Sequence, residues 1–201
     1  MCAEFSNENN KKIIERFVKI VKTIHFLLFF AIFLQKLLIF GKIIIIIEYT
    51  LIFFEGKNML LRFKIKNFRS IKEEILLDLQ ATKDETLKEQ AVFDVGKTAL
   101  LKSVAIYGPN ASGKSNLLKA MVIFRMLILE SMLRNNMNLE LPNEYFKLSS
   151  ETENKPSFFE AEFFIGNDIY FYGFEINKNK VCSEWLKQKK GKKVLFERIE
   201  Q

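Results

Sequence analysis

The sequence has few of the residues that bind metals or form disulfides. It contains two cysteines and one histidine among 201 residues. Cys2 and Cys182 lie far apart and fit no metal-ligand or redox spacing, and His25 lies in an apolar run with no second ligand near it. These features exclude a disulfide-stapled scaffold and give no sign of a Cys/His metal centre. We therefore expect free thiols in a reducing compartment.

Proline and tryptophan are also scarce, with three residues and one residue respectively. Hydrophobic residues make up 49% of the chain, which is enough to bury a core and excludes disorder as a description of the whole molecule. The net charge is +7 and the pI is about 9.3. This moderate basicity permits binding to nucleic acid or anionic lipid but requires neither.

No uncharged run reaches the length that is typical of a membrane span. The longest, residues 23–35, is shorter than the run of about 18 residues that predicts a transmembrane helix, although Lys22 and Lys36 could extend from its ends to the lipid surface. Three interpretations fit residues 1–58: a membrane anchor through residues 24–40, a hydrophobic partner-binding extension, or translated sequence upstream of a true start at Met59. We therefore divide the chain into an extension, residues 1–58, and a domain, residues 59–201.

The sequence after Met59 has the alternation of β-strands. Apolar and basic residues alternate over residues 61–66, residues 67–70 (N-F-R-S) predict a turn, and residues 74–79 predict a strand that pairs back as a hairpin. Residues 80–98 are polar and predict a loop or a short irregular helix, and residues 135–155 predict a polar connection. Further strands are predicted at residues 158–164, 169–176, 182–188 and 194–198, with hairpin turns at residues 166–168 and 177–179.

A phosphate-loop pattern lies between a predicted strand and a predicted helix. Residues 104–107 form a short apolar run, and residues 114–134 carry apolar residues at helical spacing. Between them, residues 108–115 have the sequence G-P-N-A-S-G-K-S, which satisfies G-x-x-x-x-G-K-[ST]. The pattern in this context predicts a P-loop within an α/β fold.

The residue types in this loop suit polyphosphate binding. Gly108 and Gly113 allow the backbone to turn tightly and bring N–H groups toward a polyphosphate at the positive end of the helix. Lys114 would lie between the β- and γ-phosphates, and the Ser115 hydroxyl would complete a Mg²⁺ shell. The predicted nucleotide-binding residues are Gly108, Pro109, Asn110, Ala111, Ser112, Gly113, Lys114, Ser115 and Asn116, with Ser115 as the metal ligand.

Several motifs together resemble one group of ATPases. The loop with Asn116, and the upstream N-F-R-S of residues 67–70, resemble the RecF, SMC and OLD-like branch of the ABC superfamily. Within that branch the sequence resembles prokaryotic AAA-type ATPases associated with abortive infection and restriction loci. Residues 172–176, 184–186 and 195–198 resemble the strand-rich lobe of those proteins. The resemblance covers about residues 59–201.

The resemblance implies an ATP-binding α/β domain with a mixed sheet. The antiparallel strands of the N-terminal hairpin and of the β-rich lobe after the helix would flank the P-loop strand. The implied cofactors are ATP and Mg²⁺, and the implied partners are a second ATPase subunit in a head-to-head dimer and a nuclease, in phage defence or DNA processing. Arg69 and Ser70 would either approach the nucleotide or be solvated turn residues.

The sequence also departs from this family. It contains no apolar strand ending in Asp-Glu, no signature helix and no switch histidine. We therefore predict no catalytic residue, and we expect hydrolysis only when a C-terminal half supplies these groups, because phosphoryl transfer needs a positioned metal and water.

Other functions account for parts of the sequence. A GTPase is excluded because residues 177–180 (N-K-N-K) have lysine where the base-recognition motif has a carboxylate. A small-molecule kinase fits the loop, but the β-rich remainder fits kinases poorly. A membrane-tethered interaction module with a vestigial P-loop would be membrane-associated through residues 24–40, whereas the ATPase would be cytoplasmic. Nucleic-acid binding would use the lysines at positions 187, 189, 190, 192 and 193. The alternative for these lysines is a solvated hairpin tip. Trp185, which lies nearby in the sequence, is predicted to be in the core.

Overall fold

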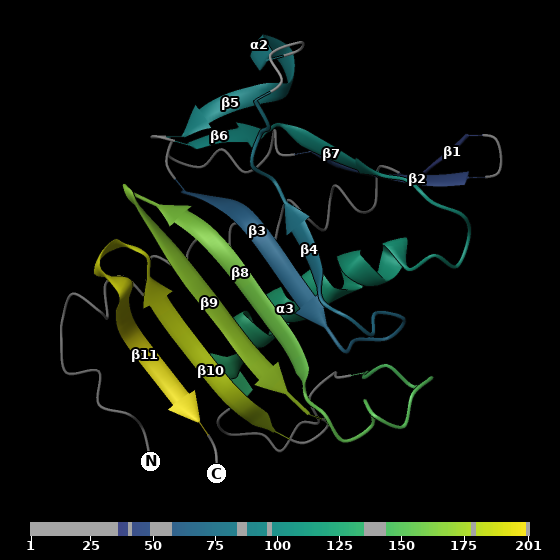
Figure 1. The fold of residues 1–201 in the computed structure, drawn as a ribbon, viewed down its shortest axis with the longest axis vertical. Helices are drawn as coiled ribbons and strands as arrows, with labels where there is room; N and C mark the ends of the chain where they lie inside the picture. Colours follow the sequence, from purple (N-terminus) through teal and green to yellow (C-terminus); the bar gives the residue numbers. More distant parts are fainter. Residues whose placement is uncertain are drawn as a thin grey trace.

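The computed structural model shows a large curved sheet with a long helix behind it (Figure 1). It describes residues 36–39, 42–48, 58–83, 88–95, 98–134, 144–177 and 180–199. For residues 36–39, 42–48, 58, 95 and 129–134 the description covers the backbone alone.

Six antiparallel strands form the largest sheet, in the order β11-β10-β9-β8-β3-β4. The strands are β3 (Asn58–Lys66), β4 (Ile75–Asp78), β8 (Ser157–Ile165), β9 (Asp168–Ile176), β10 (Val181–Gln188) and β11 (Lys193–Ile199). The short helix η1 (Lys190–Lys192) forms the tip between β10 and β11. The structure thus confirms the predicted N-terminal hairpin, the four later strands and the lysine-rich hairpin tip.

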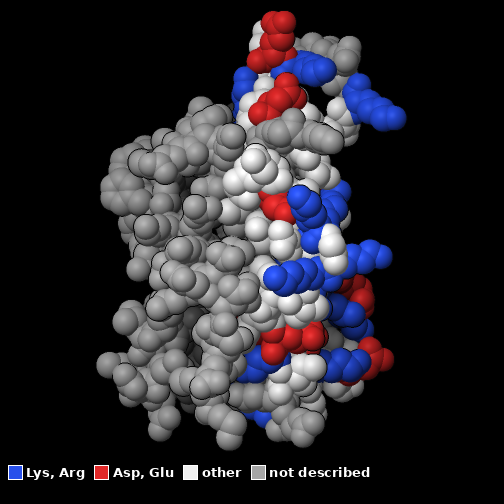
Figure 2. Space-filling model, turned by 90° about the vertical axis from the view of Figure 1, so that its left-hand side faces the viewer, with Lys and Arg blue, Asp and Glu red and all other residues white. Residues whose placement is uncertain are grey.

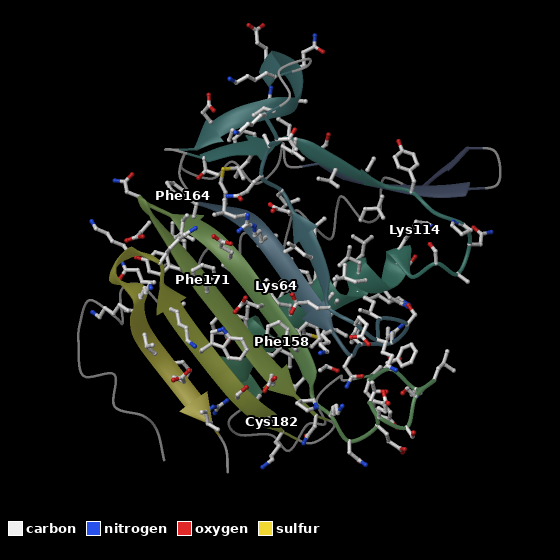
Figure 3. The ribbon with its side chains drawn as sticks, in the orientation of Figure 1. Lys64, Lys114, Phe158, Phe164, Phe171 and Cys182 are labelled. Carbon is white, nitrogen blue, oxygen red and sulfur yellow. The ribbon has the colours of Figure 1, made fainter. Side chains whose placement is uncertain are left out.

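The alternating pattern of β3 separates the two faces of this sheet. Phe63 and Ile65 are buried on the face toward the helix, while Arg62 and Lys64 point to the opposite, outer face. In Figure 3, Lys64, Phe158 and Phe171 lie on this outer face. The period of two therefore decides which side chains enter the core.

The helix α3 (Lys114–Arg134) covers the inner face of the sheet and has the predicted bounds. Phe124 lies at the centre of the contact, with its ring centroid 5.2 Å from that of Phe174 and 5.4 Å from that of Phe63. Among the helix side chains that the structure describes, the buried apolar ones follow helical spacing and are Leu117, Ala120, Met121, Phe124, Leu127 and Ile128.

The strand before the candidate loop belongs to another sheet. Strand β7 (Ser103–Ile106) pairs with β2 (Lys42–Glu48), which pairs with β1 (Lys36–Ile39), and both pairs are antiparallel. The prediction of one mixed sheet, in which the hairpin and the later strands flank the P-loop strand, is therefore not what the described residues show. Both edges of β3 are already occupied, by β4 and β8, so β7 has no free edge of that strand to join.

A small hairpin covers one end of the outer face. It consists of β5 (Val92–Val95) and β6 (Thr98–Leu101) and follows the short helix α2 (Lys88–Ala91). Leu100 of this hairpin packs with Met59, Leu61 and Phe164 of the large sheet. The sequence predicted a loop or a short helix here, so the helix is confirmed and the hairpin was missed.

The prediction of a membrane anchor falls mainly outside the described residues. Residues 24–35 and 40 are not described, and residues 36–39 form strand β1. None of the helices in the described ranges combines the length and the apolarity needed to cross a membrane.

Candidate functional site

The candidate phosphate loop (residues 108–115) connects the end of β7 to the first turn of α3. In Figure 3, Lys114 lies at the start of this helix. The backbone bends in the left-handed region at Ala111, with φ of 63°, and at Gly113, with φ of 92°. A Cβ atom at Gly108 would lie 2.8 Å from Ser112 Oγ, closer than such atoms normally approach. The backbone conformation therefore favours glycine at position 113, whereas a side chain at position 108 would have to displace the exposed Ser112 hydroxyl.

The side chain of Lys114 folds back over the loop. Its Nζ donates hydrogen bonds to the carbonyl oxygens of Gly108 at 2.8 Å and Pro109 at 2.6 Å, and lies 3.3 Å from Ser112 Oγ. The residue is only 9% exposed. Two carbonyl oxygens thus hold this positive charge at the centre of the loop. None of these three contacts is with a carboxylate.

The start of α3 presents backbone donors at the same place. Asn116 and Leu117 donate their N–H groups to the carbonyl of Gly113, at 2.8 Å and 3.2 Å. Within the described part of the chain, the backbone N–H groups of Gly113, Lys114 and Ser115 meet no acceptor. Free N–H groups at the positive end of a helix favour an anion.

The remaining predicted residues lie on the surface of the loop. Pro109, Asn110, Ala111 and Ser115 are exposed, and Ser115 is in the first turn of α3, beside Lys114. The side chain of Asn116 is held by Ser70, because its Nδ2 donates to Ser70 Oγ at 2.8 Å. The structure thus brings the nine predicted residues into one continuous loop and helix start.

These residues fit a nucleotide phosphate with Mg²⁺. The buried cation and the unpaired N–H groups would neutralise and bind phosphate oxygens, and an exposed hydroxyl at Ser115 is a suitable oxygen ligand for a hard cation. Among the residues that the structure describes, no group of three or more His, Cys, Asp or Glu side chains could hold a metal on its own.

The turn of residues 67–72 (the 67–72 turn) lies against the candidate phosphate loop. Ser70 reaches Asn116, and a Cβ atom at Gly113 would lie 3.0 Å from the same Ser70 oxygen. Arg69 is directed elsewhere and forms an ion pair with Glu144. Of the two predicted turn residues, Ser70 therefore contacts the loop, and the guanidinium of Arg69 contacts the segment after α3.

Asn67 has a structural role that the sequence analysis did not predict, since it named this residue only as part of the N-F-R-S turn. It is 3% exposed, and its Nδ2 donates to the carbonyls of Thr152 at 3.1 Å and Lys155 at 2.8 Å. Its Oδ1 accepts the N–H of Phe146 at 3.0 Å. A hint was present in the sequence, because asparagine tolerates a positive φ, here 52°, and bonds to nearby backbone in turns.

A second charged region, on the outer face of the large sheet, has paired side chains. A hollow of about 140 Å³ on the outer face is lined by Arg62, Lys64, Leu76, Glu160, Glu162 and Phe171. Its charges neutralise one another, since Arg62 pairs with Glu162 and Lys64 with Glu160. This hollow therefore offers no unbalanced charge for a ligand.

The lysine-rich tip also lies among acidic side chains. Lys187 pairs with Glu197 at 3.2 Å and Lys189 with Glu162 at 3.5 Å. Figure 2 shows Lys and Arg intermixed with Asp and Glu on the described part of that side. Nucleic-acid binding stays an untested prediction.

Trp185 is half-buried rather than in the core. Its ring stacks on Phe158, and its Nε1 donates a hydrogen bond to Glu160.

Comparison with known protein families gives a match to part of the chain. Residues 103–194 match the family described as "AAA domain, putative AbiEii toxin, Type IV TA system". No curated protein matches the chain. The matched range begins at β7, contains the candidate phosphate loop and α3, and ends in β11. The match supports an AAA-type ATPase domain of the abortive-infection type in residues 103–194, with nucleotide binding as the function that it suggests.

Proposed function

We propose that the chain binds ATP with Mg²⁺ at the candidate phosphate loop, as part of an AAA-type ATPase that acts in phage defence. The observation that carries the proposal is the position of Lys114, whose buried Nζ is held by the carbonyls of Gly108 and Pro109 beside a helix start with unpaired N–H groups. The defence context comes from the description of the matching family.

Each part of the loop has a role in this proposal. The Lys114 ammonium leaves the two carbonyls and binds phosphate oxygens, whose negative charge is a stronger acceptor. The N–H groups of residues 113–115 bind further phosphate oxygens at the start of α3. Ser115 supplies its hydroxyl to Mg²⁺, which when bound would neutralise phosphate charge. The proposal assigns no residue to the activation of water.

Replacement of Lys114 tests the proposal directly. We predict that Lys114→Ala abolishes measurable binding of Mg-ATP, because it removes the buried cation, while the folded structure remains. Calorimetric titration of the full chain with Mg-ATP and with Mg-GTP measures this. Saturable binding of Mg-ATP by the wild-type chain that is lost in the variant supports the proposal.

The matched control is Lys119→Ala. Lys119 is an exposed lysine on the same helix, so its removal changes the net charge equally but leaves the loop intact. It should bind Mg-ATP as the wild type does. Equal affinity of the wild type and Lys114→Ala would overturn the proposal, as would a folded wild-type chain that binds no nucleotide.

A further inference from the structure

The 67–72 turn joins the start of α3 to the segment of residues 144–157. On the helix side, Ser70 Oγ accepts a hydrogen bond from Asn116 Nδ2 at 2.8 Å. The same oxygen also lies close to Gly113, where the backbone bends in the left-handed region. A Cβ atom at position 113 would be only 3.0 Å from Ser70 Oγ. Ser70 thus contacts the two positions that set the direction of the loop as it enters the helix.

The turn itself is held in one shape. Phe68 and Ile71 exchange two backbone hydrogen bonds of 2.8 Å, which close the turn. Phe68 is fully buried, and its ring packs edge-on against Phe159 of β8 with a centroid separation of 5.7 Å. Ser70, between these anchors, therefore has little freedom to move relative to the sheet.

The far side of the turn is fixed by buried hydrogen bonds. Asn67 binds four groups of residues 144–157 through its side chain, namely the carbonyls of Thr152, Lys155 and Pro156 and the N–H of Phe146. Arg69 donates its backbone N–H to the carbonyl of Glu144 at 2.6 Å, and Lys72 pairs with Glu151 at 3.2 Å. The turn is consequently braced from the side opposite to α3.

We infer that Ser70 is a positioning residue for nucleotide binding, which acts through Asn116 and the bend at Gly113 and does not touch the nucleotide. By holding the Asn116 amide it keeps the first turn of α3 oriented so that the N–H groups of residues 113–115 face the phosphates. The inference rests on the proposed function. It states that Ser70, an exposed residue outside the P-loop motif, contributes to the affinity for ATP.

A double-variant cycle on Mg-ATP affinity tests the inference. Ser70→Ala and Asn116→Ala should each weaken binding roughly three- to tenfold, the factor expected when one hydrogen bond is lost. The double variant should bind no more weakly than the weaker single variant, because both changes remove the same contact. Ser70→Thr retains the hydroxyl and should restore affinity.

The matched control is Ser183→Ala. Ser183 on β10 donates to Glu175 of β9 at 2.9 Å, a serine hydrogen bond between two strands of the large sheet and outside the candidate phosphate loop. Thermal unfolding should change similarly in both alanine variants, while only Ser70→Ala weakens Mg-ATP binding. A purely structural serine would change the unfolding temperature alone.

The outcomes separate this inference from the proposed function. Normal affinity of Ser70→Ala, or additive losses in the double variant, would overturn the positioning role even if Lys114→Ala had lost all binding. If the wild-type chain binds no Mg-ATP, the proposed function fails, and the positioning role of Ser70 fails with it.

Discussion

Gly173 shows how the absence of one side chain shapes the outer face of the sheet. A Cβ atom at this position would lie 2.4 Å from Trp185 Cζ2 and 2.8 Å from the carbonyl oxygen of Phe159. The indole cannot easily retreat, because its ring stacks on Phe158 and its Nε1 donates to Glu160 at 3.0 Å. Trp185 therefore lies flat on the sheet only because the strand beneath it carries glycine there.

We predict that Gly173→Ala lowers the free energy of unfolding by about 3 kcal/mol, the upper part of the range for overpacking, because the added methyl group displaces a fixed ring. Urea unfolding measures the change. Gly166→Ala is the control, since its Cβ would meet nothing within 4 Å and only its φ of 69° opposes the substitution. It should cost about 1 kcal/mol. Equal losses in the two variants would refute the steric argument.

Tyr172 makes stability depend on pH in the alkaline range. Burial, and then the negative charge of Glu184, which accepts the Tyr172 hydroxyl at 2.6 Å, raise the pKa of this tyrosine well above its usual value. Because the pKa is raised in the folded state, the unfolded chain ionises first. The stabilisation is therefore complete below the unfolded pKa, near 10, and is lost as pH rises toward the folded pKa.

We predict that Tyr172→Phe reduces the loss of stability between about pH 9 and 11, because the variant has no hydroxyl to ionise at this position. Urea unfolding at a series of pH values measures the difference from the wild type. Tyr107→Phe, at an exposed tyrosine, should follow the wild-type profile. Parallel profiles for Tyr172→Phe and the wild type would show that the buried tyrosine does not contribute.

Among the elements, α3 carries both the candidate phosphate loop and much of the core. Phe124 contacts three rings from two strands, with centroid distances of 5.4 Å to Phe63 of β3, and of 5.9 Å to Tyr172 and 5.2 Å to Phe174 of β9. The start of the helix, and with it the loop, is thus fixed to the sheet by aromatic packing further along the same element.

We predict that Phe124→Ala lowers the free energy of unfolding by about 3–5 kcal/mol, since it leaves a cavity among these rings. Chemical denaturation followed by circular dichroism measures the loss. Leu118→Ala on the same helix, at a partly buried position, should cost clearly less. A Phe124→Ala chain as stable as Leu118→Ala would show that α3 is not held to the sheet in this way.

Element prediction succeeded where the signal was local. The bounds of α3 followed from its apolar spacing, and the strands after residue 157 followed from alternation and from turn residues that are adjacent in sequence. Strands β5 and β6 have four residues each, too few for alternation to be recognised within a polar stretch. The pairing of β7 with β2 depends on residues far apart in the chain, so no local pattern could predict it.

The candidate site was predicted unevenly for the same reason. The P-loop motif is a continuous pattern of nine consecutive residues, so the sequence alone places them together, and their role in nucleotide binding stays a prediction. The bracing role of Asn67 depends on carbonyls 85 and 88 positions later in the chain, which no sequence spacing brings near. The sequence predicted that Arg69 and Ser70 either approach the nucleotide or are solvated, and it did not predict the hydrogen bond between Ser70 and Asn116, 46 positions apart.

At the scale of the whole molecule, the two faces of the large sheet have different chemistry. The inner face is aromatic and covered by α3, whereas the outer face carries paired charges that bridge neighbouring strands, such as Arg62 with Asp78 and Glu162. A pair in which both side chains are exposed to solvent, such as Arg62 with Asp78, adds little stability by itself. The helix side therefore supplies most of the packing on which the candidate phosphate loop depends.

The order of strands in this sheet also has a consequence for folding. Strands β8 to β11 pair with their neighbours in sequence, whereas β3 must pair with β8, and the ladder brings together Arg62 and Glu162, 100 positions apart. A ribosome therefore completes the P-loop and its helix before it makes the strand that closes their scaffold. Such long-range closure slows folding more than it costs in stability. During synthesis, the candidate phosphate loop therefore lacks its contacts with the sheet and with residues 144–157 until the later strands have been made.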